Sequence, residues 1–156
     1  MEITSSAFEN NKRIPAKYTC DGENINPPLN FNTIPEGTKT LVLIMNDPDV
    51  SLKVQADGNW DHWIVFNISG SVTGVDENDV PKEGILGENT AGRLAYGGPC
   101  PPPQFEPKQH RYFFKLYALD SYLDLPEGAS KVDVEAEMNG KIIDSAFLVG
   151  LYERQQ

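Results

Sequence analysis

Two short stretches of the chain place both of its histidines beside other side chains that could bind a ligand or move a proton. In the first, Asp-Pro-Asp at residues 47–49 is followed after a loop by Trp-Asp-His-Trp at residues 60–63. The second runs from Tyr-Gly-Gly-Pro-Cys-Pro-Pro-Pro at residues 96–103 into the His-Arg-Tyr that begins residues 110–120. Because each stretch sets carboxylate, imidazole or phenol groups at the end of an apolar run, we interpret them as two halves of one pocket.

Three kinds of chemistry are open to two aspartates and two histidines. Imidazole and carboxylate groups are suitable ligands for a divalent metal, but the chain has no His-Glu-x-x-His motif and no His-x-His pair. A hydrolase that uses His62, His110 and Asp47 is a second reading. Against this reading, the chain has no Gly-x-Ser-x-Gly elbow, no Gly-x-x-x-x-Gly-Lys loop and no cysteine with a histidine beside it in sequence. Both readings stay open as alternatives.

Binding of a small anion fits these residue types best. Imidazoles near their titration point, the hydroxyl of Tyr112 and the backbone N–H groups of the glycine loop can all donate hydrogen bonds. Asp47 could accept from one imidazole, fix its tautomer and aim the other ring nitrogen at a ligand. The prolines that follow Gly98 stiffen the loop and lower the cost of ordering it on binding. Trp60 could form an apolar wall, whereas we favour plain core packing for Trp63.

The composition is that of one globular domain over residues 1–156. A formal net charge of −10 opposes non-specific binding to nucleic acid and to anionic membranes, which relies on clustered Lys and Arg. The longest apolar run, residues 41–45, is far shorter than the ~20 residues of a membrane span. Because residues 1–4 have no basic region and no apolar core, we expect no export signal and a cytoplasmic protein.

Cys20 and Cys100 are the two cysteines. In a reducing cytosol we expect two free thiols, although cytoplasmic proteins of hyperthermophiles are an exception. A bridge between them would be worth about 4–5 kcal/mol, since it would close a long loop. As a free thiol in the pocket loop, Cys100 should react with small thiol reagents and be shielded by a bound anion.

Prolines and glycines punctuate the chain into short segments, which favours an all-β domain. Apolar runs predict buried strands at residues 41–46, 63–68 and 112–119, and weaker strands at 3–8 and 147–152. One helix is predicted at residues 130–139, with Ser130 as its cap, Asp133 in its first turn and Gly140 after its end. A second short helix is an option near residues 141–148.

The predicted strands also bring the two halves of the pocket together. Asp47 ends the first strong strand, His62 begins the second, and His110 and Tyr112 begin the third. If the first two strands are antiparallel neighbours, the ends that carry Asp47 and His62 coincide. His110 and Tyr112 share one face of their strand by the two-residue period. We therefore expect three strand ends to converge beneath loops, the usual place for a site on a β scaffold.

At these residues the sequence resembles the phosphatidylethanolamine-binding protein family, in its prokaryotic Raf-kinase-inhibitor-like branch. The resemblance covers Asp-Pro-Asp at 47–49, the His-Trp strand at 61–68 and the long motif at 96–102 with 110–114. Weaker similarity covers residues 18–22, 27–29 and 150–152.

The resemblance implies a mainly β fold, a Greek-key antiparallel β-sandwich with one or two short helices, and a small preformed pocket for phosphate-like anions. Such an anion would be a phospholipid head group, a phosphorylated small molecule or a nucleotide. It also implies a non-catalytic monomer or homodimer without cofactor or metal, and a regulator of a kinase or protease. A partner-binding inhibitor with a vestigial pocket is the remaining alternative. The predicted ligand-binding residues are Asp47, Asp49, Trp60, His62, Gly98, Cys100, Pro101, His110 and Tyr112.

Three features depart from the family pattern. Val50-Ser51 replaces a small residue and proline, which loosens one rim. The link at residues 104–109 is longer than usual and should bring Phe105 and Lys108 near the mouth. The chain ends soon after Tyr152, without the C-terminal helix of eukaryotic members, so we expect an open mouth.

Overall fold

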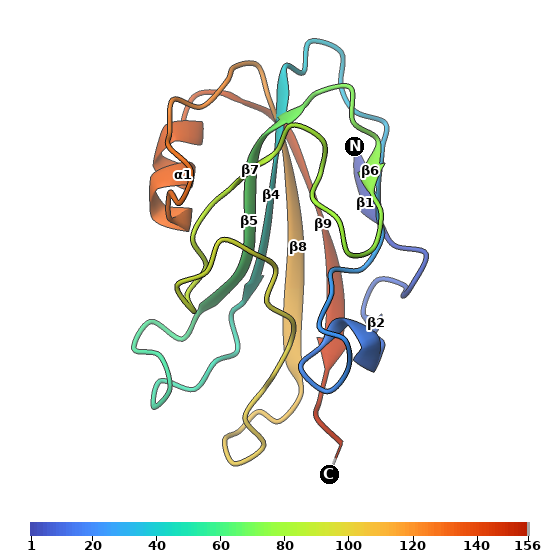
Figure 1. Ribbon diagram of the computed structural model, residues 1–156, viewed down its shortest axis with the longest axis vertical. Helices are drawn as coiled ribbons and strands as arrows, with labels where there is room; N and C mark the ends of the chain where they lie inside the picture. Colours follow the sequence, from blue (N-terminus) through green and yellow to red (C-terminus); the bar gives the residue numbers. More distant parts are fainter. Residues whose placement is uncertain (156) are drawn as a thin grey trace.

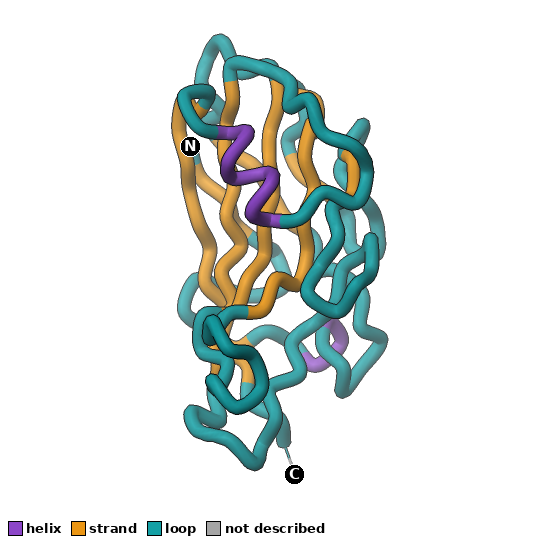
Figure 2. Tube along the Cα trace, turned by 90° about the vertical axis from the view of Figure 1, so that its left-hand side faces the viewer, coloured by secondary structure: helices purple, strands orange, loops and turns teal. Residues whose placement is uncertain are grey.

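The computed structural model describes residues 1–155 and consists of two β-sheets, with one α-helix against the outer face of the larger sheet (Figures 1 and 2). The larger sheet has the order β2-β9-β8-β4-β5-β7: Lys12–Arg13, Ile142–Tyr152, His110–Leu119, Thr40–Asp47, Trp60–Ser69 and Ile85–Leu86. The smaller sheet contains β1 (Glu2–Thr4), β3 (Leu29–Asn32) and β6 (Gly74–Val75). All pairings are antiparallel except the short parallel pair of β2 and β9.

Strand β4 is the central element, because every one of its residues is buried. Leu43 and Met45 lie in the core between the two sheets, together with Phe31 of β3. Val42 and Ile44 point to the other face, where they pack with the helix. A strand that is covered on both faces needs apolar residues at every position, which explains the continuous apolar run in the sequence. The predicted strands at 41–46, 63–68 and 112–119 are confirmed as parts of β4, β5 and β8.

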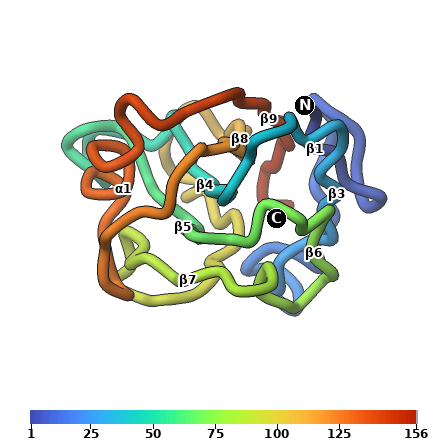
Figure 3. Tube along the Cα trace, turned by 90° about the horizontal axis from the view of Figure 1, so that it is seen from above, coloured from blue at the N-terminus to red at the C-terminus, as the bar shows by residue number. Residues whose placement is uncertain are grey.

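The predicted helix is confirmed as α1 (Lys131–Met138). The hydroxyl of Ser130 accepts a hydrogen bond from the Asp133 backbone N–H at 3.2 Å, and the Asp133 carboxylate accepts one from the Ser130 N–H, which completes a capping box. Val134 and Met138 are buried against the sheet, one helical turn apart. Seen from above in Figure 3, α1 lies beside β4 and β5, on the opposite side from β1 and β3.

Two secondary-structure predictions were wrong. Residues 141–148 form no second helix, because most of them belong to β9, which pairs with β8 from Tyr152 to Ile142. The long ladder to a buried neighbour outweighs the weak local preference for a helix. Near the N-terminus the strand covers only Glu2–Thr4, so the predicted strand at 3–8 was too long. The only other helical turn of the described residues is the short 3-10 helix η1 (Ala16–Tyr18).

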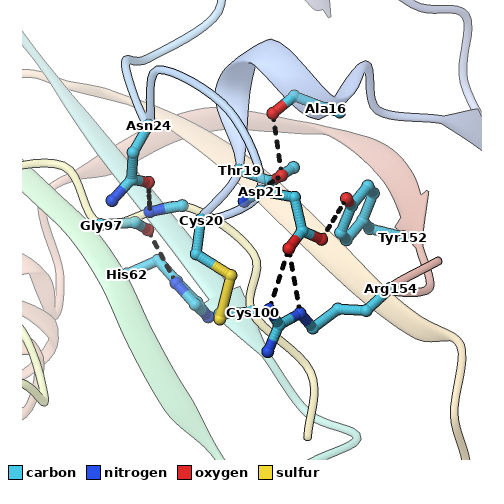
Figure 4. The surroundings of a disulfide bond; sticks show 11 residues. Ala16, Thr19, Cys20, Asp21, Asn24, His62, Gly97, Cys100, Tyr152 and Arg154 are labelled. Carbon is cyan, nitrogen blue, oxygen red and sulfur yellow. Dashed lines mark hydrogen bonds and ion pairs between the residues drawn. A yellow bond between two sulfur atoms is a disulfide. The ribbon is translucent and has the colours of Figure 1, made fainter. Parts of the chain in front are cut away.

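Cys20 and Cys100 form a disulfide, so the expectation of two free thiols was wrong (Figure 4). Their Cα atoms are 5.4 Å apart, within the ordinary range for a bridge. Backbone contacts bring the two distant segments together: the N–H of Cys20 donates to the Pro99 carbonyl at 3.1 Å. Since Cys100 carries no free thiol, the predicted reaction with thiol reagents does not apply to the oxidised protein.

Removal of this bridge should destabilise the fold. The sequence separation of 80 residues implies a loss of about 4–5 kcal/mol in the free energy of unfolding, because the unfolded chain gains loop entropy. Urea unfolding of the Cys20→Ser/Cys100→Ser double variant should show this loss, and the reduced parent should match the variant. A loss below about 1 kcal/mol in both would contradict the entropic account.

Candidate functional site

Three strand ends meet at one edge of the larger sheet, as the sequence predicted. Asp47 at the end of β4 lies opposite Trp60 at the start of β5. On the other side of β4, Asn46 lies opposite Phe113 of β8. In Figure 1 these strand ends lie in the lower half of the view, where the loops that precede β5 and β8 extend below the sheet.

The Asp-Pro-Asp motif ends β4 and fixes two carboxylates in different directions. Pro48 has no N–H and cannot continue the ladder. The Asp47 carboxylate accepts from the backbone N–H of Asp49 at 2.8 Å and, through its other oxygen, from Nδ1 of His110 at 2.6 Å. The Asp49 carboxylate instead pairs with Arg111, whose guanidinium donates at 2.8 and 2.9 Å. Asp49 therefore ties the loop to β8 and does not line the pocket, contrary to the prediction.

A β-bulge turns His62 toward Asp47 and Tyr112. Trp63 of β5 lies opposite Met45, but the next pair joins Asp61 to Asn46, so His62 is an extra residue in the ladder. By simple alternation His62 would share the outer face of Ile64, away from the core between the sheets. The bulge instead places the His62 ring edge-on to the Tyr112 ring at 5.3 Å between centroids. Bulges often redirect a side chain in this way beside functional sites.

One pocket of about 390 Å³ lies beneath these strand ends. Its floor consists of Asp47, His62 and Tyr112, all buried, while its rim includes the exposed side chains of Val54 and Arg93. The other lining residues are Cys20, Asn24, Val50, Trp60, Asn89, Ala91, Tyr96, Gly97, Gly98, Cys100, Pro101 and Pro102.

Most of the predicted ligand-binding residues thus line one pocket: Asp47, Trp60, His62, Gly98, Cys100, Pro101 and Tyr112. His110 and Asp49 do not. Trp63 is 1% exposed and packs edge-on against Tyr96, which confirms the prediction that it is a core residue. Neither Phe105 nor Lys108 lines this pocket, so the prediction that they approach its mouth was wrong; Lys108 lines a smaller separate cavity.

The tautomer of His62 follows from one hydrogen bond. Its Nδ1 lies 2.8 Å from the carbonyl oxygen of Gly97, and because a carbonyl only accepts, Nδ1 carries the proton (Figure 4). Burial lowers the pKa of His62, and the Gly97 carbonyl and the charge of Asp47 offset this only in part. The ring is therefore neutral near pH 7, and its Nε2 is an acceptor with no partner among the described residues.

The backbone donors of the glycine loop are already in use. Gly97 N–H donates to the His62 carbonyl at 2.9 Å, and Gly98 N–H donates to the side-chain oxygen of Asn24 at 2.8 Å. The expectation that these amides would face a ligand was wrong. A Cβ at Gly98 would lie 2.4 Å from the Tyr18 carbonyl oxygen, so glycine is needed here for close approach of two loops.

Tyr112 presents the one buried hydroxyl without a partner among the described residues. Its ring is wholly buried, stacks on His110 with centroids 6.3 Å apart, and lines the pocket. Burial raises the pKa of Tyr112, and the nearby Asp47 carboxylate raises it further through its charge and as an acceptor that favours the protonated hydroxyl, although no hydrogen bond of ordinary geometry joins the two groups. An unpaired buried hydroxyl costs free energy, so Tyr112 supplies a hydrogen-bond donor that a ligand can satisfy.

His110 does not line the pocket and affects it only through its hydrogen bond to the Asp47 carboxylate. Burial alone would lower the pKa of His110, but the hydrogen bond and charge of Asp47 outweigh burial and raise it. When it is protonated, the imidazole balances the Asp47 charge, and its hydrogen bond holds the carboxylate in one orientation. Asp47 thus accepts from an imidazole as the sequence predicted, but this imidazole does not face the pocket.

Several lining residues had no signal in the sequence. Arg93 and Asn89 come from the irregular segment between β7 and β8, and nothing in their spacing relates them to Asp47. Only the folded loop brings them to the site. Within residues 1–155 no group of three or more His, Cys, Asp or Glu side chains could hold a metal ion. The same residues contain no helix that is long and apolar enough to cross a membrane.

Comparison with known proteins found a family model and several relatives that match almost the whole chain. The family model described as phosphatidylethanolamine-binding protein matches residues 4–153. A protein named UPF0098 from Methanothermobacter thermautotrophicus is 47% identical, with 99% of each chain covered. The solved structure of a putative phosphatidylethanolamine-binding protein homologue from Chlamydia trachomatis has a TM-score of 0.93 at 44% identity, covering 99% of this chain and 97% of that one. Escherichia coli YbcL, described as a member of the mammalian family, has a TM-score of 0.87 at 28% identity, covering 99% and 98%.

The raised pKa of His110 makes its contribution to stability dependent on pH. This contribution is complete below the unfolded value of about 6.5 and is lost as pH rises through the higher folded value. His110→Gln should therefore cost about 3 kcal/mol near pH 5.5 and clearly less near pH 8.5. Urea unfolding of parent and variant at both pH values measures the difference, and the titration of His62 cancels because both proteins contain it. A cost that is equal at the two pH values would show that His110 is not charged in the native protein.

Proposed function

The chain belongs to the phosphatidylethanolamine-binding protein family, and on this premise we propose that it is a non-catalytic protein that binds small phosphate-like anions in the pocket whose floor contains Tyr112. The observation that carries the proposal is the buried Tyr112 hydroxyl, which lines a preformed pocket and has no partner among the described residues. An anionic oxygen would complete its hydrogen bonding.

Charge and shape support this proposal. Arg93 stands at the rim, and the raised pKa of His110 favours a protonated ring that would balance the charge of Asp47. Trp60 and Val54 line an apolar part of the pocket that suits the organic part of a phosphorylated ligand. The floor is held by contacts within the protein, so binding requires little ordering of side chains.

Several observations favour binding over turnover. Both cysteines that line the pocket are bridged, and none of the lining residues is a serine or threonine. The Asp47 carboxylate already accepts two hydrogen bonds, and Nδ1 of His62 is committed to Gly97. A hydrolase that uses Asp47, His62 and His110 would have to use Nε2 of His62 as its base, and the lining residues offer no serine, threonine or free thiol for that base to activate. Screening phosphate and carboxylate esters, with and without divalent metal, tests this alternative.

Regulation of a kinase or protease stays a prediction, as do the cytoplasmic location and the choice between monomer and homodimer. A pull-down from the source organism with parent and Tyr112→Phe baits tests the first. If a partner is captured equally by both baits and no anion binds, the protein is a partner-binding inhibitor with a vestigial pocket.

Tyr112→Phe is the sharpest test of the pocket. Removal of an unpaired buried hydroxyl should leave stability unchanged or raise it, because no protein hydrogen bond is lost. Affinity for inorganic phosphate should fall by roughly 1.5–3 kcal/mol, the value of a hydrogen bond to a charged group. Calorimetry and urea unfolding measure the two effects.

Tyr152→Phe is the matched control. The Tyr152 hydroxyl donates to Asp21 at 2.6 Å outside the pocket, so its loss should lower stability and leave phosphate affinity unchanged. If phosphate binds the parent and the Tyr112→Phe variant equally, the anion does not contact the floor.

We expect little adsorption to anionic vesicles at physiological salt, because the net charge of −10 repels such surfaces. Sedimentation with vesicles of phosphatidylcholine and phosphatidylserine measures this, with O-phosphorylethanolamine as the soluble comparison. Strong vesicle binding would mean that a local surface outweighs the net charge.

A further inference from the structure

The floor of the pocket offers more hydrogen-bond acceptors than donors. Tyr112 provides a hydroxyl donor, whereas the Asp47 carboxylate and Nε2 of His62 are acceptors. Among residues 1–155, Asp47 and Arg93 are the only side chains lining the pocket that belong to the Asp, Glu, Lys and Arg types. This balance is unusual for a site that would bind any anion, because a fully ionised oxyanion also has only acceptors.

We propose that the floor selects oxyanions that still carry one acidic proton, namely inorganic phosphate and phosphomonoesters in their singly protonated form, and rejects sulfate and phosphodiesters. This inference rests on the proposed function and specifies the ligand class for the same site. In such a complex an ionised oxygen accepts from Tyr112, and the P–OH group donates to Asp47 or to His62.

The Asp47 carboxylate has room for one more hydrogen bond. One of its oxygens accepts from Asp49 N–H at 2.8 Å and the other from His110 Nδ1 at 2.6 Å, while a carboxylate offers about four lone-pair positions. An oxyanion without a proton would place its own charge against this carboxylate with nothing between them. A protonated oxygen turns the same contact into a charge-assisted hydrogen bond.

The orientation of His62 adds a second acceptor at the floor. Its Nδ1 proton is held by the Gly97 carbonyl, so Nε2 can donate to a ligand only if the buried ring takes up a second proton. Burial is the largest effect and opposes that proton, and His110 of β8 opposes it too, while the Gly97 carbonyl, Asp47 of β4 and Asp61 of β5 favour it. The pKa of His62 is lowered on balance, because burial outweighs the groups that favour the charged ring.

The glycine loop does not compensate for the shortage of donors. The amides of Gly97 and Gly98 are bonded to the His62 carbonyl and to Asn24. Arg93 is exposed at the rim and attracts anions of every kind without distinguishing them. Discrimination between protonated and unprotonated oxyanions must therefore come from Asp47 and His62.

Calorimetry near pH 6 at fixed ionic strength tests the proposal with ligands of matched shape. A phosphomonoester has its second pKa near 6, so both of its forms are present, whereas sulfate and dimethyl phosphate carry no acidic proton. Inorganic phosphate, methyl phosphate and O-phosphorylethanolamine should bind, and sulfate and dimethyl phosphate should bind at least about tenfold more weakly, which corresponds to one such hydrogen bond.

Asp47→Asn should remove most or all of the preference for phosphate over sulfate. The amide keeps the shape of the carboxylate and supplies an N–H donor, so the ratio of phosphate to sulfate affinity should fall by about tenfold or more. Asp49→Asn is the matched control, because it makes the same change two residues away in a group that pairs with Arg111 outside the pocket. This control should keep the parent's ratio. The comparison of ligands on the parent stands even if the Asp47 variant fails to fold.

The outcomes separate this inference from the proposed function. If the parent binds phosphate and sulfate equally, the selection for a protonated oxyanion is wrong and the anion pocket stands. If it binds none of these ligands, the proposed function itself is wrong. Glycerophosphoethanolamine, a diester that keeps the ammonium group of a lipid head group, distinguishes the ligand sources: binding as tight as that of O-phosphorylethanolamine would overturn the requirement for a P–OH group.

Discussion

The hydrogen bond between Asp47 and His110 is the contact on which the arrangement of the site depends. At 2.6 Å and almost fully buried, it joins the end of β4 to the start of β8 and fixes one carboxylate oxygen. A buried pair of this kind contributes little net stability, because desolvation of both groups offsets their attraction. Its effect is geometric: it holds the Asp47 carboxylate where it borders the pocket. Since Asp47 also accepts from the N–H of Asp49, the carboxylate has little freedom to turn.

The walls of the pocket are held in place by contacts between segments that lie far apart in the sequence. The Cys20–Cys100 bridge, the hydrogen bond from Gly98 to Asn24 and the one from the Tyr96 hydroxyl to the Tyr18 carbonyl join the loop before β8 to η1 and the segment after it. The Gly98 N–H is used in this way and the Gly97 N–H donates to the His62 carbonyl, so neither amide is free for an anion. A preformed cavity results, in which Tyr112 has been left unpaired. The proposal of binding rather than turnover draws on the same contacts, because both cysteines of the pocket are bridged and none of the lining residues is a serine or threonine.

Selection for a protonated oxyanion would follow from which groups the protein has left free. A carboxylate and a neutral imidazole at the floor reject unprotonated charge, and a single hydroxyl accepts one ionised oxygen as its partner. If so, the choice of ligand depends less on the net charge of the pocket than on the match between the hydrogen-bond donors and acceptors of pocket and ligand. On the same proposal, Arg93 at the rim attracts anions of every kind, and the buried floor distinguishes protonated from unprotonated oxyanions.

The sequence alone determined the β-rich fold, the buried central strand, the capped helix and the convergence of the strand ends that carry Asp47, His62 and Tyr112, because apolar period and residue order constrain all of these. The tertiary structure decided the rest. Strand alternation would have turned His62 away from the pocket, and only the bulge between Met45 and Asn46 redirects it. The pairing of β9 with β8 overrode a local helical preference, and loop packing joined Cys20 to Cys100 across 80 residues. The chain carries the donors and acceptors in its composition, but only the fold determines which of them are already paired, because hydrogen bonds between distant loops leave no periodic pattern in the sequence.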